Sequence, residues 1–462
     1  MTDLPRLPDG FLYGVSTAAY QIEGAVDADG RGPSVWDTFC AVPGAIRNGE
    51  SGAVACDHYH RYREDVALMR DLGVDAYRFS IAWPRVQPAG EGPANPAGLD
   101  FYDRLVDELL DHGIRPAATL YHWDLPQALQ DRGGWENRET AHRLAEYAAL
   151  LGERLGDRVA MWMPLNEPAV VTLFGHAVGT HAPGRRLGLD ALPVAHHQLL
   201  GHGLAVQALR AAGASDIGIA SHHMPVRAAS DAPGDEEAAR LFDTLMNWTF
   251  ADPVLRGSYP DAFVASLMPG PVAEDLAVIS TPLDWYGVNY YQPALVGAPG
   301  TASAASPLLE GAPVPEGLPF EVLRITGVPT TDFGWAVVPE GLRDVLTAFR
   351  DRYGPALPPL HVTESGCSYH DTVDADGRVR DARRIEYHDA HLRAVAEAVA
   401  RGVDVRGYFA WSLLDNFEWA EGYTERFGLV HVDYATQRRT PKDSYAWFRR
   451  LLADRAGGST GR

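Results

Sequence analysis

The sequence predicts a single (β/α)8 barrel of the TIM type, with insertions in the loops that follow its strands. Two observations lead to this prediction. Short apolar runs alternate with segments of helical periodicity along the chain, and several of these runs come directly after a helix that ends in glycine. Glycine supplies the left-handed residue that closes a helix, and an uninterrupted apolar run suits a strand that is buried on both faces.

The helix–glycine–strand junctions lie at Gly73, Gly113 and Gly402. Together with the other apolar runs they predict strands at 11–15, 76–80, 116–121, 159–163, 216–220, 283–289, 359–363 and 406–411. Eight strands separated by helices fit a closed parallel barrel. An open doubly wound sheet would produce the same local pattern, so the pattern favours the barrel without excluding the sheet.

The chain shows no internal domain boundary. We expect one domain over residues 1–462, with its core at about 11–448 and a disordered tail at 456–462. One low-complexity segment, Val296 to Pro319, is rich in Ala, Gly, Pro and Ser and follows the sixth predicted strand. In a barrel this position belongs to an active-site loop, so the segment is either a lid over the pocket or a surface insertion.

The composition excludes some partners. Hydrophobic residues make up 46% of the chain and charged residues 22%, which is typical of a globular protein, and the formal net charge is -21. Binding to nucleic acid requires a basic surface, and an anionic membrane would repel this one. We therefore expect neither partner, and we expect neutral substrates rather than polyanions.

The cysteines indicate a reducing compartment. Cys40, Cys56 and Cys367 are far apart in the sequence and show no CxxC spacing. The first residues carry no basic segment followed by an apolar run, and no stretch is long and apolar enough to span a bilayer. These observations predict a cytoplasmic protein.

Polar side chains stand at the ends of the buried strands. Glu167 follows the fourth strand within Asn166-Glu167-Pro168, and Glu364 follows the seventh within Thr363-Glu364-Ser365. The other strand ends carry Tyr121-His122-Trp123-Asp124, Asn289-Tyr290-Tyr291 and Trp411. In a barrel all these ends meet at one face. Two carboxyl groups meeting there suit glycoside hydrolysis, in which one donates a proton while the other, ionised, faces the sugar carbon. A single strand-end glutamate would suit an ion pair or a helix cap equally well.

Five segments of the chain resemble one family. They are Ser16–Gly24 (STAAYQIEG), Tyr77–Ser80 (YRFS), Leu165–Pro168 (LNEP), Val362–Gly366 (VTESG) and Trp411–Trp419 (WSLLDNFEW). In this order, and from Phe11 to about Phe448, the sequence is similar to glycoside hydrolase family 1. The first and last segments are long and specific, whereas the short motifs around the two glutamates would be weak alone.

The resemblance implies a retaining β-glycosidase that releases terminal non-reducing β-D-glucosyl residues through a covalent glycosyl-enzyme intermediate. It implies that Glu167 is the acid/base and Glu364 the nucleophile, supported by Arg78, Asn166 and Tyr291. The expected substrates are small β-glucosides and short oligosaccharides such as cellobiose. The residues expected to bind the sugar or its aglycone are Gln21, His122, Trp123, Asn289, Trp335, Trp411, Glu418, Trp419 and Phe427.

The chain departs from the family pattern at two positions beside these glutamates. Pro164 stands where the family usually has threonine, and Ser365 where it usually has asparagine after the nucleophile. Proline lacks a backbone N–H, so we expect the pairing of the fourth strand to change locally. Neither departure removes a catalytic group, although both could alter affinity for the substrate.

Two other functions fit parts of the pattern. A 6-phospho-β-glycosidase would share the fold, but such relatives hold the phosphate with a serine and a nearby lysine. Here Glu418 takes the matching position and Lys442 is the only lysine. A non-catalytic sugar-binding protein would be expected to lack one of the glutamates, and transglycosylation would use the same intermediate as hydrolysis. The spacing of the histidines matches no metal-binding motif, so no metal or other cofactor is expected, and the oligomeric state stays open.

Overall fold

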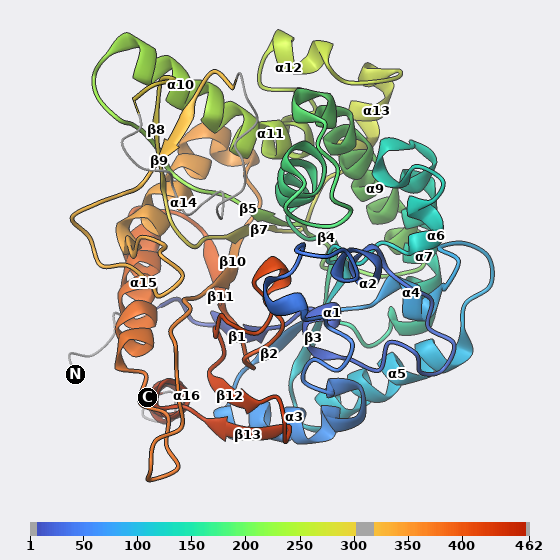
Figure 1. Cartoon of the computed structure of the whole chain (residues 1–462), viewed down its shortest axis with the longest axis vertical. Coiled ribbons are helices and arrows are strands. Elements are labelled where there is room, and N and C mark those ends of the chain that lie inside the picture. The colour runs from blue at the N-terminus through green and yellow to red at the C-terminus, as the bar shows by residue number, and fades with distance from the viewer. Residues whose placement is uncertain (1–6, 302–317, 459–462) are drawn as a thin grey trace.

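Eight parallel strands form the centre of the molecule (Figure 1). The computed structural model describes residues 7–301 and 318–458. Neighbouring strands pair in the order β4-β3-β2-β1-β11-β10-β7-β5, and two isolated bridges, Trp162 with Ile217 and Asn166 with Ala220, join β4 to β5. The sheet is therefore a nearly closed barrel, which confirms the predicted fold class. The strands are β1 (Leu12–Ser16), β2 (Ala76–Ser80), β3 (Arg115–Tyr121), β4 (Met161–Leu165), β5 (Ala220–His222), β7 (Tyr286–Asn289), β10 (Leu360–Ser365) and β11 (Val405–Trp411).

The fifth strand lies later in the chain than predicted. It covers Ala220–His222 rather than 216–220, and Ile217 forms only an isolated bridge to β4. Pro164 lies on β4, between the bridged residues Trp162 and Asn166, and has no N–H to donate to β5. On its other side β4 keeps a regular ladder with β3, in which Leu165 pairs with Tyr121. The expected effect of Pro164 is thus found on one edge of the strand only.

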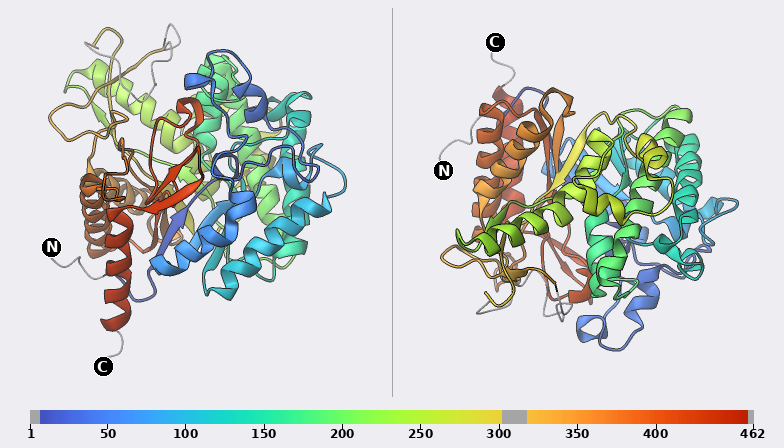
Figure 2. Two further views of the ribbon diagram at one scale, coloured as in Figure 1. Left: turned by 60° about the horizontal axis from the view of Figure 1, so that its bottom comes forward. Right: turned by 90° about the horizontal axis from the view of Figure 1, so that it is seen from above.

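Helices cover the outside of the barrel (Figures 1 and 2). The helices that precede β2, β3 and β11 are followed by Gly73, Gly113 and Gly402, whose φ angles are 84°, 72° and 87°. These left-handed residues confirm the predicted junctions. In the described ranges no helix is long and apolar enough to span a bilayer. The helices are α1 (Ala19–Ile22), α2 (Val35–Cys40), α3 (His58–Leu72), α4 (Trp83–Val86), α5 (Pro96–Asp111), α6 (Gln127–Gln130), α7 (Glu139–Leu155), α8 (Pro168–Val170), α9 (Leu192–Ala211), α10 (Pro233–Asp243), α11 (Thr249–Arg256), α12 (Ala262–Ser266), α13 (Val272–Ile279), α14 (Pro339–Tyr353), α15 (Ala382–Ala400) and α16 (Asp443–Gly458).

Small side chains and methionines from several strands pack together in one cluster. Ala76, Ala117, Met161 and Met163 belong to it. Because side chains alternate along a strand, Arg78 lies on the same face of β2 as Ala76. Its Nε lies 3.2 Å from the sulfur of Met163. The barrel therefore carries a buried guanidinium group beside an apolar layer, and such a charge requires an anionic partner.

Part of the low-complexity segment is regular structure. Val296 belongs to β8 (Ala294–Gly297), which pairs with β6 (Val226–Ala228) and β9 (Glu321–Leu323) in a small sheet beside α10. The first residues of the low-complexity segment, Val296 and Gly297, thus belong to a strand. Residues 302–317 lie outside the described part of the chain, so the choice between a lid and an insertion stays open.

The end of the chain is helical for longer than expected. Helix α16 continues to Gly458, although we expected a disordered tail from residue 456. Helical hydrogen bonding thus continues past the first residues of the Gly-rich stretch, and residues 459–462 lie outside the described part of the chain.

A buried network of ion pairs holds the loop that connects β11 to β12. Strand β12 (Val430–Asp433) pairs with β13 (Arg438–Pro441). The ammonium group of Lys442 lies 2.6 Å from Asp371 and 2.7 Å from Asp415. Asp415 also pairs with Arg426 at 2.9 Å and accepts the backbone N–H of Gly428 at 2.9 Å. These ion pairs therefore fix the loop between β11 and β12.

Candidate active site

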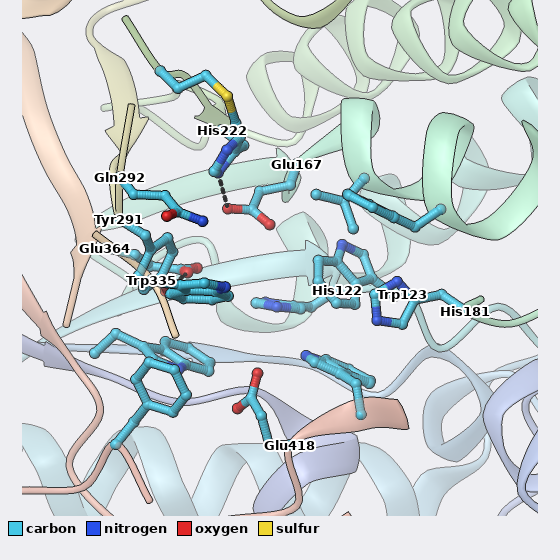
Figure 3. Close-up of a pocket in the computed structure, with 16 residues that line it drawn as sticks. His122, Trp123, Glu167, His181, His222, Tyr291, Gln292, Trp335, Glu364 and Glu418 are labelled. Carbon is cyan, nitrogen blue, oxygen red and sulfur yellow. Dashed lines mark hydrogen bonds and ion pairs between the residues drawn. The ribbon is translucent and has the colours of Figure 1, made fainter. Parts of the chain in front are cut away.

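A pocket opens at the carboxyl ends of the barrel strands (Figure 3). Residues at or just after the ends of β3, β4, β5, β7, β10 and β11 line it, from His122 directly after β3 to Trp411 at the end of β11. This is the face at which the sequence predicts the site. The pocket is lined by His122, Trp123, Glu167, Val170, Phe174, His181, His222, Met224, Tyr291, Gln292, Trp335, Glu364, Trp411, Glu418, Trp419 and Phe427.

Glu364 is buried beside two donors that favour its carboxylate form. It stands on β10, and its Oε1 forms an ion pair with Arg78 across the barrel interior. Its Oε2 accepts a hydrogen bond of 2.7 Å from the Tyr291 hydroxyl. Burial raises the pKa of Glu364 to about 7, the guanidinium of Arg78 opposes this rise, and the nearby Glu167 carboxyl adds to it. The two donors therefore compensate part of the cost of burying this group.

Glu167 is held by neutral donors instead. It follows β4 in the left-handed region, with a φ of 47°, which brings its side chain into the pocket. The amide of Asn289 donates to its Oε1 at 2.8 Å, and Nδ1 of His222 lies 3.6 Å from the same oxygen. The hydroxyl of Thr363 donates to Oδ1 of Asn289 at 2.6 Å, which fixes the orientation of that amide. No arginine or lysine contacts Glu167 among the described residues that line the pocket.

Asn166 links the two glutamates. Its Oδ1 accepts hydrogen bonds from Arg78 at 2.6 Å and from Asn289 at 3.1 Å. Its Nδ2 lies 3.1 Å from Nε2 of His122, so His122 accepts this bond in a neutral tautomer. Burial, assisted by the Arg78 charge, lowers the pKa of His122 well below its usual range. His122 is therefore an uncharged hydrogen-bonding group in the pocket.

Aromatic rings form the walls. The His122 ring stacks on Trp411 and on Trp419, in each case with a centroid distance of 5.9 Å. On the opposite side Trp335 packs against Tyr291 at 5.3 Å and against Phe427 at 5.8 Å. Aromatic faces suit the apolar C–H surface of a pyranose. Trp335 is half-buried and lines the pocket, and its role as a platform stays a prediction.

Several predicted residues lie behind the pocket surface. Gln21 is fully buried and donates to the carbonyl of Phe417 at 2.8 Å and to Glu418 Oε2 at 3.4 Å. The structure thus brings Gln21 and Glu418 together from opposite ends of the chain. Arg78, Asn166 and Asn289 are also fully or almost fully buried and do not line the described pocket. Arg78 and Asn289 contact the glutamates directly, whereas Asn166 contacts Arg78 and Asn289.

The arrangement combines two carboxyl groups with different partners in one pocket. One is paired with a cation and the other with neutral donors. Such a pair suits proton donation to a leaving oxygen on one side and nucleophilic attack on the other.

The comparisons agree with this geometry. The family model described as glycosyl hydrolase family 1 matches residues 4–456. This chain belongs to glycosyl hydrolase family 1. It is 44% identical over 455 residues to β-glucosidase A of Thermotoga maritima, a match that covers 97% of this chain and 98% of the relative. It is 49% identical to thermostable β-glucosidase B of Thermobispora bispora, with 96% of this chain and 90% of the relative covered.

Solved structures of family 1 enzymes share the fold. The psychrophilic β-glucosidase of Micrococcus antarcticus superposes with a TM-score of 0.92 at 49% identity, covering 97% of both chains. The family 1 β-glucosidase of Thermotoga maritima gives a TM-score of 0.91 at 43% identity, covering 98% of this chain and 99% of that chain. The likeness thus extends over the complete barrel of this family 1 member.

The second departure from the family pattern lies away from the pocket surface. Ser365 is fully buried, and its hydroxyl lies 3.3 Å from that of Tyr387 on α15. It is absent from the described lining of the pocket. Its direct contacts are therefore structural, and an effect on affinity stays a prediction.

Sequence reasoning missed three polar residues of the pocket: His181, His222 and Gln292. His222 had a usable signal, because it ends strand β5 and polar strand ends were the criterion for a site residue. The predicted strand ended at residue 220, so the strand-end criterion was not applied to His222. Gln292 follows Tyr291 in the loop after β7, whereas His181 comes from a loop beyond β4 for which the sequence offers no signal.

The interaction between the two carboxyls can be measured directly. In Glu167→Gln the pKa of Glu364 is expected to fall below about 7, because a neutral amide removes the charge that contributes to the rise. Titration of 13C-labelled glutamate by NMR measures this shift. Replacing the exposed Glu340 with glutamine provides a control that leaves the pKa of Glu364 in place. An equal pKa in the native protein and in Glu167→Gln would show that the carboxyls do not interact.

Proposed function

We propose that this family 1 chain is a retaining β-glucosidase. It hydrolyses terminal non-reducing β-D-glucosyl residues of small β-glucosides and of short oligosaccharides such as cellobiose. The observation that carries the proposal is the pairing of Glu364 with Arg78 and Tyr291 while Glu167, in the same pocket, meets the neutral amide of Asn289. The names of the relatives, which include β-glucosidases and a 1,4-β-D-glucan glucohydrolase, support the choice of glucosides.

In the first step Glu364 attacks the anomeric carbon and forms a glycosyl ester. The bond from that carbon to the glycosidic oxygen breaks, and Glu167 donates its proton to this oxygen so that the aglycone leaves as an alcohol. In the second step Glu167, now ionised, takes a proton from water, and the hydroxide oxygen displaces Glu364. Two displacements at the same carbon restore the β configuration.

The neighbouring groups have matching roles in this mechanism. The hydrogen bonds that Arg78 and Tyr291 donate to Glu364 favour the ionised form of the nucleophile against the effect of burial and fix its direction. Asn166 is placed to bind the sugar 2-OH, a contact that strengthens as the oxocarbenium ion develops. Trp411 provides a stacking surface for the ring, and Trp335 faces the aglycone side. Gln21, His122, Glu418 and Trp419 recognise the remaining hydroxyls, while Trp123, Asn289 and Phe427 complete the site.

Substitution of the glutamates separates their roles. Glu364→Gln is expected to lose roughly 10⁴-fold or more activity on every substrate, because no covalent intermediate forms. Glu167→Gln is expected to lose about 10²–10⁴-fold on cellobiose but to retain the first step with 2,4-dinitrophenyl β-D-glucoside, whose leaving group needs no proton. Pre-steady-state release of dinitrophenolate measures this step. Equal losses on good and poor leaving groups in Glu167→Gln would remove the acid assignment.

The 6-phospho-β-glycosidase alternative depends on the charge around Glu418. No lysine or arginine is found among the described residues that line the pocket. Arg426, which is close in sequence, pairs with Asp415 at 2.9 Å, and Lys442 pairs with Asp415 and Asp371. Both cations therefore neutralise other carboxylates, and a 6-phosphate would meet Glu418 as a like charge.

We therefore expect the unmodified glucoside to be the better substrate. Bringing two anions together in a desolvated pocket costs several kcal/mol, so kcat/KM for 4-nitrophenyl β-D-glucoside 6-phosphate should be at least roughly 100-fold lower than for the glucoside. Glu418→Ser should reduce this difference in kcat/KM between the two substrates, mainly because the glucoside loses hydrogen bonds to its 4-OH and 6-OH. Faster turnover of the 6-phosphate by the native protein would overturn the substrate assignment. Turnover of neither substrate would favour the non-catalytic sugar-binding alternative.

A further inference from the structure

His222 stands beside the carboxyl group of Glu167, at the end of β5 (Figure 3). Its Nδ1 lies 3.6 Å from Oε1 of Glu167, just beyond hydrogen-bonding distance. Both side chains are largely buried, with 13% of the His222 side chain and 5% of the Glu167 side chain exposed. A polar ring in this position is in reach of the group that must alternate between a neutral and an ionised form.

The surrounding structure fixes the direction of the His222 ring. Its backbone pairs in register with Asn289 of β7, whose amide donates to the same oxygen of Glu167. Its ring stacks on Tyr291 with an interplanar angle of 17° and a centroid distance of 6.3 Å. A histidine held in this way needs little reorganisation to form a hydrogen bond with Glu167.

The titratable groups near His222 are few. Glu167 faces it from the end of β4, and Tyr291 faces it from the loop after β7 with its hydroxyl committed to Glu364. The adjacent His223 directs its ring nitrogens to Asn247 and the Tyr286 hydroxyl, and burial lowers its pKa to about 3. Glu167 is therefore the one anionic group that the described structure places next to the His222 ring.

We propose that His222 is a positioning residue for Glu167, donating a hydrogen bond from Nδ1 to the carboxylate that Glu167 becomes once it has protonated the leaving oxygen. This inference rests on the proposed acid/base role of Glu167. The proton that leaves Glu167 goes to the glycosidic oxygen, and His222 keeps its own proton throughout. Catalytic hydrogen bonds are often long in the free enzyme and shorten during the reaction, as the 3.6 Å separation requires here.

Such a contact has a distinctive kinetic signature. It stabilises Glu167 only as negative charge develops, so it assists substrates that need a proton and leaves those with good leaving groups unaffected. Loss of the donor should therefore lower kcat/KM more strongly as the leaving group becomes more basic.

Three variants test the proposal. His222→Phe keeps a ring against Tyr291 but removes the donor, whereas His222→Asn places an amide near the position of Nδ1. We expect His222→Phe to lower kcat/KM about tenfold on cellobiose and less than about twofold on 2,4-dinitrophenyl β-D-glucoside. We expect His222→Asn to recover most of the loss. The control is His181→Phe, because His181 lines the same pocket with ring contacts to Trp36, Trp123 and Phe174.

The control should change kcat/KM for both substrates by the same factor. A loss in His222→Phe that is equal for both leaving groups would overturn the role of His222. Failure of His222→Asn to recover activity on cellobiose would also contradict it. Absence of activity in the native protein on both glucosides would instead reject the proposed function, so the two failures are distinguishable.

Discussion

The buried ion pair between Arg78 and Glu364 is the contact on which the rest of the site depends. Both side chains are almost completely buried, and breaking such a pair by removing one partner costs about 3–5 kcal/mol, since the other charge is left uncompensated. Arg78 occupies a strand position where its guanidinium also reaches Asn166. One cation inside the barrel thereby orients a carboxylate from β10 and an amide from the end of β4. The positions of Asn289 and Glu167 follow from that amide through shared hydrogen bonds.

The pocket keeps its charges few and its polar groups neutral. His122 is uncharged and stacks on indole rings, and Arg426 and Lys442 are paired with Asp415 and Asp371. The field at the two catalytic carboxyls is therefore set mainly by Arg78 and by the carboxyls themselves. A neutral sugar meets little electrostatic resistance in such a pocket, whereas an added anion meets two or three carboxyl groups. The same ion pairs fix the loop that carries Glu418 and Trp419. Substrate recognition therefore depends on charged residues that do not line the described pocket.

Much of this architecture could be predicted from sequence because its determinants are local. Glycine at a helix end imposes a left-handed residue, and polar residues at the ends of buried strands must converge in a barrel, so Glu167, Glu364 and Tyr291 were found by position alone. The fifth strand was misplaced because Ile217 forms only an isolated bridge to β4, and the pairing of two strands is a non-local feature. The omission of His222 followed from that error. The contacts that Gln21 forms with residues about 400 positions away are likewise specified by no local pattern.

Backbone conformation is a second reason why the sequence was insufficient. Trp123, Glu167 and Trp419 line the pocket with φ angles of 78°, 47° and 46°, which bulky residues adopt at a cost. Propensity alone would place none of them in the left-handed region, and the packing of the surrounding rings and hydrogen bonds holds them there. These conformations direct their side chains toward the substrate space and away from the strands that carry them.

The central claim is that Glu364 becomes covalently bonded to the sugar during turnover. It is tested most directly by incubating the native protein with 2,4-dinitrophenyl 2-deoxy-2-fluoro-β-D-glucoside, which slows both steps but keeps the good leaving group. Peptide mapping by mass spectrometry then locates the adduct. The account predicts stoichiometric release of dinitrophenolate and one fluoroglucosyl ester, on Glu364. An ester on Glu167, or no adduct together with α-glucose as the first product from the unfluorinated glucoside, would contradict it.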